Sequence, residues 1–366
     1  MSETKLRKAL YNLGIWRHRP ALSVRLIIAL FAMALPIQAQ DILSERVRLV
    51  GRFHSEPSKI TAEWPGSLIE IRFEGTQLDV TISDSGNNSI IVEVNGKPIL
   101  LDTQLGEHTY SIVNVENPSN HVVRIIKRTE AAFGKISLTR IWTDGSFMPP
   151  IINRKKILVL GDSISAGYGV EGADTNCGFE AEFENQYLTY AAVAARNLDA
   201  DIVTLAVSGA GLVRNYNGET QRTMTQLLYQ LLPSSSVPAP LPLAEVVVVH
   251  LGTNDFADGA RPNDFIAAYE TLLKEVRATS PDAMIYATMG PMLRPEDQNA
   301  AVVAIESAVV TRHLEGDDNV GMIRFGWQPD PEDLGCDWHP SAKAHARMAI
   351  ELEQRIRKDI NWGKLN

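Results

Sequence analysis

The 366-residue sequence predicts two domains of different class, an antiparallel β-sandwich followed by a three-layer α/β domain with a five-stranded parallel sheet. Up to about residue 142, short segments alternate apolar and polar residues with a period of two. From residue 156 onward, near-continuous apolar runs alternate with helical patterns. The stretch 145–156 separates the two patterns, and its Pro149 and Pro150 are unsuited to a sheet interior.

Residues 40–148 are expected to form the sandwich. Six segments in this part alternate apolar and polar side chains, and each is closed by Gly, Asn, Asp or Pro. This spacing is typical of an antiparallel sandwich, in which one side of each strand faces the core. The predicted strands lie within 67–75, 77–86, 89–99, 108–116, 121–130 and 135–145.

Residues 149–366 are expected to form the α/β domain. Five short apolar runs are each followed by a helical pattern, which predicts parallel strands covered by helices on both faces. In such sheets, ligands bind at the carboxyl ends of the strands. The runs are 156–160, 201–207, 245–252, 283–290 and 320–325, and the helical patterns that follow them are 185–198, 223–232, 263–278, 296–314 and 341–358.

The first 39 residues resemble a secretory signal peptide. A basic segment precedes ten apolar residues at 26–35, and small residues follow, with cleavage expected after Ala39. The apolar run is short for a bilayer span, although an uncleaved anchor is the alternative. We therefore expect a periplasmic or secreted protein that is not stably inserted in a membrane after cleavage.

The charge of the chain bears on its partners. Removal of residues 1–39 takes away six positive charges and one negative charge, which moves the formal net charge from −9 to −14. An acidic mature protein argues against nucleic acid or an anionic membrane surface as a partner. A neutral substrate such as a sugar is compatible with this charge.

A serine follows the first predicted strand of the α/β domain. In "KILVLGDSISAGYG", Ser163 stands at the strand tip, where its hydroxyl faces the ligand crevice. A serine hydroxyl needs a base to become a nucleophile. His339, in the loop after the last apolar run, lies at the same sheet edge and is the candidate base. Asp337 is two residues away, on the same side of an extended segment, and is the candidate group that orients His339.

Donors for a tetrahedral oxyanion are expected at the same edge. The backbone N–H groups of Ser163 and Gly209 and the side-chain amide of Asn254 all follow predicted strands. No histidine–carboxylate cluster has metal-ligand spacing, and "GAGL" lacks the full dinucleotide fingerprint. We therefore expect neither a metal nor a cofactor.

Four blocks occur in the order found in the SGNH, or GDSL-like, hydrolases: "GDSI", "SGAG", "GTND" and "DWHP". Longer stretches, including "WPGSLIEIRFEGT", "ENQYLTYAA" and "GCDWHPS", resemble the carbohydrate esterase family 2 acetyl esterases. That resemblance implies an N-terminal jelly roll, an SGNH domain, and removal of O-acetyl groups from polysaccharides or oligosaccharides such as xylan and mannan. It implies that Ser163 is the nucleophile and His339 the base, with Gly209 and Asn254 in the oxyanion hole.

Two positions depart from the broader SGNH pattern. The acid usually stands three residues before the histidine, where this chain has Cys336. The resemblance therefore leaves two ways to orient His339, either Asp337 or a backbone carbonyl. The cysteine often found after the nucleophile block is replaced by Ala166, so Cys177 is the candidate disulfide partner of Cys336, with two free thiols as the alternative.

Three further residues are candidates for substrate binding, since their loops lie at the active edge. Tyr168 and Asn215 are expected to line the pocket, and Trp338 is either a platform for a sugar ring or a packing anchor. Two other functions remain open. An esterase of this class acting on a lipid, thioester or cell-wall acetyl ester would use the same residues, and a non-catalytic carbohydrate-binding protein would keep the scaffold alone.

Overall fold

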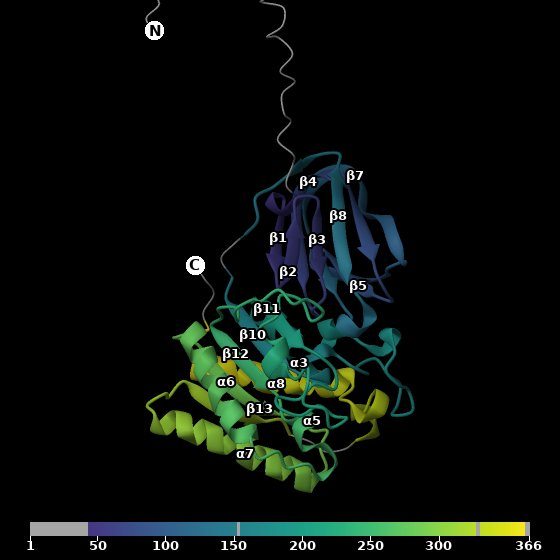
Figure 1. Ribbon diagram of the computed structural model, residues 1–366. Helices are drawn as coiled ribbons and strands as arrows, with labels where there is room; N and C mark the ends of the chain where they lie inside the picture. The colour runs from purple at the N-terminus through teal and green to yellow at the C-terminus, as the bar shows by residue number, and fades with distance from the viewer. Residues whose placement is uncertain (1–42, 152–153, 327–329, 363–366) are drawn as a thin grey trace, which may run out of the picture. The chain divides into compact units, whose positions relative to one another are not determined.

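The computed structural model describes residues 43–151, 154–326 and 330–362, which lie in one compact unit. The predicted leader, residues 1–39, is outside the described residues. Within the described ranges, the strands form one sheet of nine strands and one of five (Figure 1). No helix in these ranges is both long enough and apolar enough to cross a membrane.

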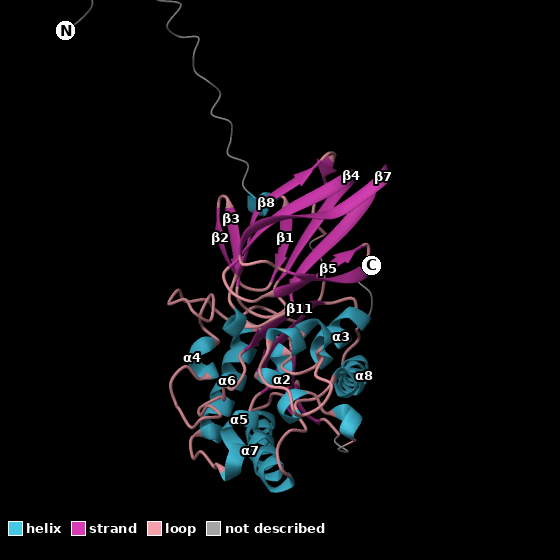
Figure 2. Ribbon diagram, turned by 90° about the vertical axis from the view of Figure 1, so that its right-hand side faces the viewer, coloured by secondary structure: helices cyan, strands magenta, loops and turns pink. Residues whose placement is uncertain are grey.

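The first sheet is antiparallel and follows the path β2-β3-β8-β4-β7-β5-β6, with β1 and β9 paired beside β4 (Figure 2). Its strands form where the period-two alternation places apolar side chains on one side. Their bounds are β1 (Val47–Val50), β2 (Phe53–Glu56), β3 (Lys59–Ala62), β4 (Leu68–Asp84), β5 (Ser89–Val94), β6 (Lys97–Asp102), β7 (Gly106–Lys127), β8 (Ile136–Thr143) and β9 (Ser146–Phe147).

The long strand β4 connects two parts of the sandwich. Its first half pairs with β1 and β9, whereas its second half pairs with β8. A register shift between Gly75 and Gln77 marks the change of partner. The predicted sandwich is confirmed, but segments 67–75 and 77–86 form one strand, because a bulge bends a strand without ending it. Segments 108–116 and 121–130 likewise form the single strand β7, whereas 89–99 is divided between β5 and β6. The shared core includes Ile60, Ile71, Phe73, Val80, Ile125 and Leu138.

The second sheet is the predicted five-stranded parallel sheet. Its strand order is β11-β10-β12-β13-β14, so the chain begins in β10 and places the next two strands on either side of it. Burial on both faces explains why these strands are mainly apolar. Their bounds are β10 (Lys156–Gly161), β11 (Asp201–Ala206), β12 (Val246–His250), β13 (Met284–Met289) and β14 (Val320–Arg324).

Helices cover both faces of this sheet and complete the three layers (Figure 1). Helices α6 (Phe265–Thr279) and α7 (Pro295–Leu314) pack on one face. Helices α3 (Tyr190–Asn197) and α8 (Ala342–Asp359) pack on the other. Shorter helices are α2 (Ser163–Ala166), α4 (Met224–Leu227), α5 (Thr253–Phe256), and the single 3-10 turns η1 (Leu43–Glu45), η2 (Ala131–Phe133), η3 (Ala181–Phe183), η4 (Gln186–Leu188), η5 (Ala257–Gly259), η6 (Pro331–Asp333) and η7 (Cys336–Trp338).

One predicted helix, 223–232, is reduced to the single turn α4. After Leu228 the backbone turns away from the helix, and the Leu231 N–H donates to the Val237 carbonyl at 2.8 Å. The apolar periodicity had indicated a longer helix because Leu227, Leu228 and Leu232 are all buried. Leu232 reaches the core from the loop instead.

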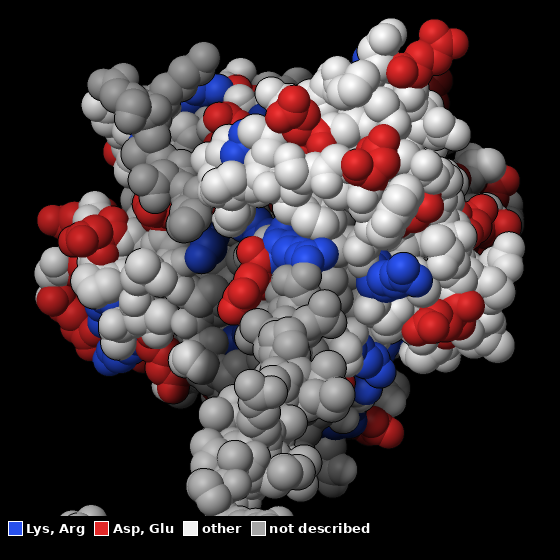
Figure 3. Space-filling view, turned by 90° about the horizontal axis from the view of Figure 1, so that it is seen from above, with Lys and Arg blue, Asp and Glu red and all other residues white. Residues whose placement is uncertain are grey.

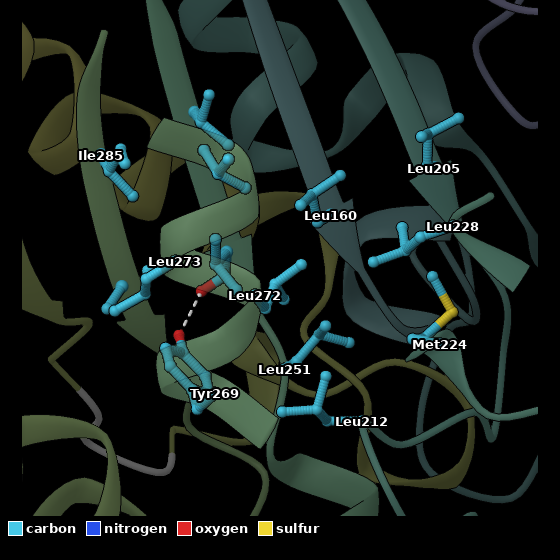
Figure 4. Close-up of a cluster of buried hydrophobic side chains, with 14 of the residues drawn as sticks. Leu160, Leu205, Leu212, Met224, Leu228, Leu251, Tyr269, Leu272, Leu273 and Ile285 are labelled. Carbon is cyan, nitrogen blue, oxygen red and sulfur yellow. Dashed lines mark hydrogen bonds between the residues drawn. The ribbon is translucent and has the colours of Figure 1, made fainter. Parts of the chain in front are cut away.

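Alternate residues of each parallel strand enter different cores. Leu158 and Leu160 face the α6 and α7 side, whereas Ile157 and Val159 face the α3 and α8 side. Figure 4 shows the first of these cores, where the Tyr269 hydroxyl donates to the Val249 carbonyl at 3.1 Å. Each fully buried leucine or valine stabilises the fold by about 1.5–3 kcal/mol, and these cores hold the strand ends that carry the site.

Side chains near the start of the sandwich attach it to the α/β domain. Arg48 donates to the Asp201 carboxylate at the beginning of β11, at 2.6 Å. The Arg52 guanidinium donates to carbonyl oxygens of the loop that follows α4. Trp64 is buried, and its Nε1 donates to the Leu231 carbonyl at 3.0 Å. These hydrogen bonds hold the sandwich in a fixed position against the α/β domain.

Candidate active site

The carboxyl ends of three parallel strands meet at one edge. Gly161, the last residue of β10, is in register with Ala206 of β11 and His250 of β12. The turns that carry the predicted serine, glycine and asparagine therefore leave the sheet side by side. The strand order reverses at β10, which is where ligands bind in open α/β sheets.

Ser163 begins α2 directly after β10. The Asp162 carboxylate caps this helix by accepting a hydrogen bond from the Ile164 N–H at 3.1 Å. Complete burial raises the pKa of Asp162 to about 7. A side chain on Gly161 would collide with Ser165, since a Cβ there would lie 2.3 Å from the Ser165 Oγ. The tight turn therefore requires glycine at 161 and directs Ser163 to the crevice.

His339 lies beside Ser163, although 176 residues separate them in the chain. The His339 Nε2 is 2.8 Å from the Ser163 Oγ. The His339 Nδ1 is 3.1 Å from the backbone carbonyl oxygen of Cys336. A carbonyl can only accept, so Nδ1 carries the proton and Nε2 is free to accept the serine proton. The imidazole is thus held in the tautomer that a general base requires.

The position of Asp337 corrects the sequence-based expectation. Its carboxylate accepts a hydrogen bond from the Tyr168 hydroxyl, while the Cys336 carbonyl occupies the His339 Nδ1. The expectation assumed an extended segment, but Asp337 and Trp338 have φ of 49° and 60°, in the left-handed region. In this turn the carboxylate bonds the Tyr168 hydroxyl and not the imidazole nitrogen. The alternative named from the sequence, a backbone carbonyl, is what the structure shows.

Tyr168 closes one side of the catalytic pair. Its ring meets the His339 ring edge-on, with 3.9 Å between the centroids. Its hydroxyl is engaged by Asp337, and burial together with that carboxylate raises the pKa of Tyr168 above its usual value. Tyr168 lines the pocket, as predicted, and it also fixes the plane of the imidazole by packing.

The predicted oxyanion donors line the same pocket as the catalytic pair. Gly209 has φ of 75°, and neither its N–H nor that of Ser163 donates to any described residue. The Asn254 Nδ2 donates one hydrogen bond to the Ala210 carbonyl at 3.0 Å, and its second hydrogen is available to the pocket. The three donors can therefore serve an oxygen bound next to Ser163.

Asp255 holds the loop that contains Gly209. Its buried carboxylate accepts hydrogen bonds from the N–H groups of Leu212, Val213 and Arg214 at 2.8–3.0 Å. Burial raises the pKa of Asp255, and these donors oppose that shift. Asp255, which directly follows Asn254, thus anchors the loop after β11 that carries Gly209.

The site opens into a cavity of about 730 Å³. Trp338 lines it with 61% of its surface exposed, which favours a platform over a packing anchor. Asn215 does not line the cavity, and this prediction is wrong. Its side chain accepts from the Gly211 N–H and donates to the Gln221 carbonyl, so it braces the loop while its neighbour Tyr216 faces the cavity.

Sequence reasoning missed one wall of the cavity. Met292, Leu293 and Arg294 line it, together with Asp297 of α7 and Phe179. The first three residues follow β13, so the same strand-end argument that located Ser163 would have indicated them. Phe179 lies in a long loop after α2, and no local signal marks it.

The Sγ atoms of Cys177 and Cys336 are bonded, which is the predicted pairing. Cys336 is buried and also supplies the carbonyl that holds His339. The backbone approaches closely here, because a Cβ on Gly172 would lie 2.5 Å from the Cys336 Sγ. The disulfide therefore ties the loop after the nucleophile to the histidine loop. No described group of His, Cys, Asp or Glu could hold a metal ion.

Burial determines the protonation of the base. Desolvation lowers the pKa of His339 to about 4, while the Cys336 carbonyl and the Asp337 charge oppose that shift. The neutral imidazole is the active form, so kcat/KM is expected to stay high well below pH 6.5 and to fall as the pH approaches 4. A pH–rate profile with 4-nitrophenyl acetate measures this limb, with circular dichroism at each pH as the control for folding. A midpoint at or above 6.5 would contradict it.

A conservative change at Asp337 tests how His339 is oriented. We expect Asp337→Asn to lower kcat by less than about tenfold, because the Cys336 carbonyl still holds Nδ1 and only a nearby charge is lost. Replacing an aspartate that directly holds the imidazole typically costs about 10⁴-fold. Steady-state kinetics distinguish these outcomes, and a loss near 10⁴-fold would restore Asp337 to the predicted role.

A serine hydroxyl, a neutral imidazole with a fixed tautomer and unpaired donors beside them constitute the site of a serine hydrolase that transfers acyl groups. Comparison with known proteins agrees with this class. Residues 159–347 match the GDSL-like lipase/acylhydrolase family, and residues 49–150 match the carbohydrate esterase 2 N-terminal family.

Several relatives match both domains. The structure of a family two carbohydrate esterase from Clostridium thermocellum in complex with cellohexaose has a TM-score of 0.83 and 33% identity, covering 87% of this chain and 100% of that chain. Cellulase/esterase CelE of Acetivibrio thermocellus is 34% identical over 85% of this chain, which spans only 39% of CelE. An acetylxylan esterase / glucomannan deacetylase of Cellvibrio japonicus is 28% identical over 86% of this chain and 89% of its own length. The chain thus belongs to the GDSL-like hydrolases and, within them, to the family 2 carbohydrate esterases.

Proposed function

We propose that the protein is an exported esterase that removes O-acetyl groups from polysaccharides or oligosaccharides of the xylan or mannan type. The observation that carries the chemistry is the 2.8 Å contact between the Ser163 Oγ and the His339 Nε2, next to unpaired oxyanion donors. The relatives named as acetylxylan esterase / glucomannan deacetylase support the substrate class.

The reaction proceeds in two acyl-transfer steps. The His339 Nε2 takes the Ser163 proton as Oγ attacks the acetyl carbon, and the carbonyl oxygen becomes an oxyanion held by Ser163 N–H, Gly209 N–H and Asn254. Collapse breaks the bond to the sugar oxygen, which leaves with the proton from His339. Water then attacks the acetyl-serine with His339 as base, and acetate is released as the serine proton returns.

The surface of the cavity supports a neutral, sugar-like leaving group. Exposed aromatic rings of Trp338 and Tyr216 line it, and such rings pack against the apolar faces of sugars. Of its charged residues, Arg294 lies 3.3 Å from Asp297 and 3.7 Å from Asp258, and the Asp337 carboxylate accepts a hydrogen bond from the Tyr168 hydroxyl. On the face seen in Figure 3, acidic and basic side chains are interspersed, which together with the acidic net charge argues against nucleic acid as a partner.

Acetate release from acetylated xylan and acetylated glucomannan tests the function. We expect turnover of both polymers and a preference for 4-nitrophenyl acetate over esters of longer acids, with Ser163→Ala as the inactive control. Preference for a longer acyl chain would assign the protein to a lipid or thioester substrate. Binding of acetylated xylan without any release of acetate would assign it to the non-catalytic class.

Export rests on the leader pattern of residues 1–39, and a disulfide is compatible with an oxidising compartment. We expect the protein recovered from the periplasm or the medium to begin at Gln40. N-terminal sequencing tests this, and a membrane-bound protein that retains residues 1–39 would instead identify an uncleaved anchor.

A further inference from the structure

The residues that follow strand β7 of the sandwich contact the α/β domain. The Arg128 guanidinium donates to the backbone carbonyls of Ala181 and Glu182, at 2.9 and 2.7 Å. The Arg128 carbonyl in turn accepts from the Gln186 N–H at 3.0 Å. Arg128 is 2% exposed, so this junction is part of the interior. The residues that follow it are therefore held at a defined place beside the active site.

Glu130, two residues after Arg128, contacts the loop after β11 that carries Gly209. Its Oε2 accepts a hydrogen bond from the Ser208 N–H at 2.9 Å, and Glu130 is fully buried. Ser208 immediately precedes Gly209, and both residues line the active-site cavity. The Glu130 carboxylate, which belongs to the sandwich, thus holds the peptide group between Val207 and Ser208. The next peptide group along the chain carries the Gly209 N–H.

Contacts on either side of Gly209 are made within the α/β domain. The Ala210 N–H donates to the Val207 carbonyl at 3.2 Å and closes a turn around Ser208 and Gly209. The Tyr216 N–H donates to the Gly209 carbonyl at 2.9 Å. The outer side of the turn, at the Ser208 N–H, depends on Glu130. Without that acceptor the Ser208 N–H loses its partner, and the position of the adjacent Gly209 N–H is less tightly fixed.

A buried lysine lies close to this carboxylate. The Lys127 ammonium is fully buried and donates to the carbonyls of Thr129 and Glu130, at 2.7 and 2.9 Å. Burial raises the pKa of Glu130, whereas the hydrogen bonds from Ser208 and the Lys127 charge oppose that shift. Burial also raises the pKa of the neighbouring Glu184 carboxyl. Burying several charged groups together costs free energy of folding, which indicates a role for the contact between Glu130 and Ser208.

We propose that Glu130 is a positioning residue for the oxyanion hole, so that the sandwich domain supplies one of the groups that place the Gly209 N–H. The inference rests on the proposed function, because the place of this N–H matters only if an oxyanion forms at Ser163. It makes the sandwich a functional part of the active site in addition to a packing partner.

Glu63 provides a matched control at the same junction. Its buried carboxylate also reaches from the sandwich to the α/β domain, where it accepts from the N–H and the hydroxyl of Ser234, each at 3.0 Å. Ser234 does not line the active-site cavity. Glu63→Ala therefore removes a comparable interdomain contact without touching the Gly209 turn.

The test compares Glu130→Ala, Glu130→Gln, Glu130→Asp and Glu63→Ala in the full chain, by kinetics on 4-nitrophenyl acetate and acetylated xylan and by urea unfolding. We expect Glu130→Ala to lower kcat by about 10–100-fold with KM within about twofold, since the contact acts on the transition state. Glu130→Gln keeps an acceptor oxygen and should recover most of the rate. Glu130→Asp keeps the charge but withdraws the oxygen, and should behave like Glu130→Ala. Glu63→Ala should lose stability with kcat near that of the wild type.

Several results would overturn the inference. If Glu130→Ala is too unstable to assay, a folded Glu130→Asp with wild-type kcat decides against the inference. Equal losses of kcat in Glu130→Ala and Glu63→Ala would indicate general loosening of the junction. Failure of the proposed function is distinguishable, because the wild-type protein itself would then be inactive on both substrates.

Discussion

Ser163→Ala is expected to lower kcat for acetyl ester hydrolysis by about 10⁶-fold. The Ser163 Oγ is the atom that receives the acetyl group, and among the described residues no other hydroxyl contacts the His339 Nε2. The remaining donors and the cavity still bind substrate, so KM should change little. Steady-state hydrolysis of 4-nitrophenyl acetate and acetate release from acetylated xylan measure the loss.

The control is a comparison of the losses of kcat in the single and double variants of Ser163 and His339, which should not add. His339→Ala alone and the double variant with Ser163→Ala should lose nearly as much as Ser163→Ala, since each change removes the same acyl-transfer route. Ser163 is buried and alanine is slightly smaller and adds no polar group, so unfolding in urea should be little changed. A Ser163→Ala protein that keeps more than a tenth of the wild-type kcat would rule out the acetyl-serine mechanism.

Cys177→Ser is expected to lower the free energy of unfolding by about 4–5 kcal/mol. The disulfide closes a loop between residues 159 apart in sequence, and it restricts the unfolded chain accordingly. The change leaves Cys336 in place, so the carbonyl that holds His339 is not replaced. Urea unfolding monitored by circular dichroism measures the shift.

Reduction of the wild-type protein is the matched control for Cys177→Ser. Dithiothreitol should move the wild-type unfolding curve toward that of the variant, and it should leave the variant unchanged. If the two oxidised proteins unfold at the same urea concentration, or if the wild type is insensitive to reduction, the disulfide does not contribute as stated.

The main residues of the site could be predicted because strand ends are predictable. Apolar runs located β10, β11 and β12, and the edge they share brings Ser163, Gly209 and Asn254 into one cavity. Parallel strands put all their carboxyl ends at one edge, so the sequence position of each residue relative to its strand was sufficient. The same rule extends to Met292, which follows β13.

Loop geometry escaped this reasoning. The orientation of Asp337 depends on two consecutive left-handed residues, a conformation that tryptophan rarely adopts and that no sequence pattern indicated. Asn215 lies at the active edge but turns inward to brace its own loop. Glu130 was also missed, because it belongs to a different domain and its partner is a backbone N–H.

The residues alone predict the succession of a sandwich and a parallel α/β domain, the nucleophile, its base and the three oxyanion donors, since all of these depend on periodicity and on order along the chain. The folded chain alone decided which oxygen holds the imidazole, which side chains face the cavity and that the sandwich reaches the Gly209 turn. Those outcomes depend on backbone dihedral angles and on contacts between segments more than 70 residues apart, to which local patterns are insensitive.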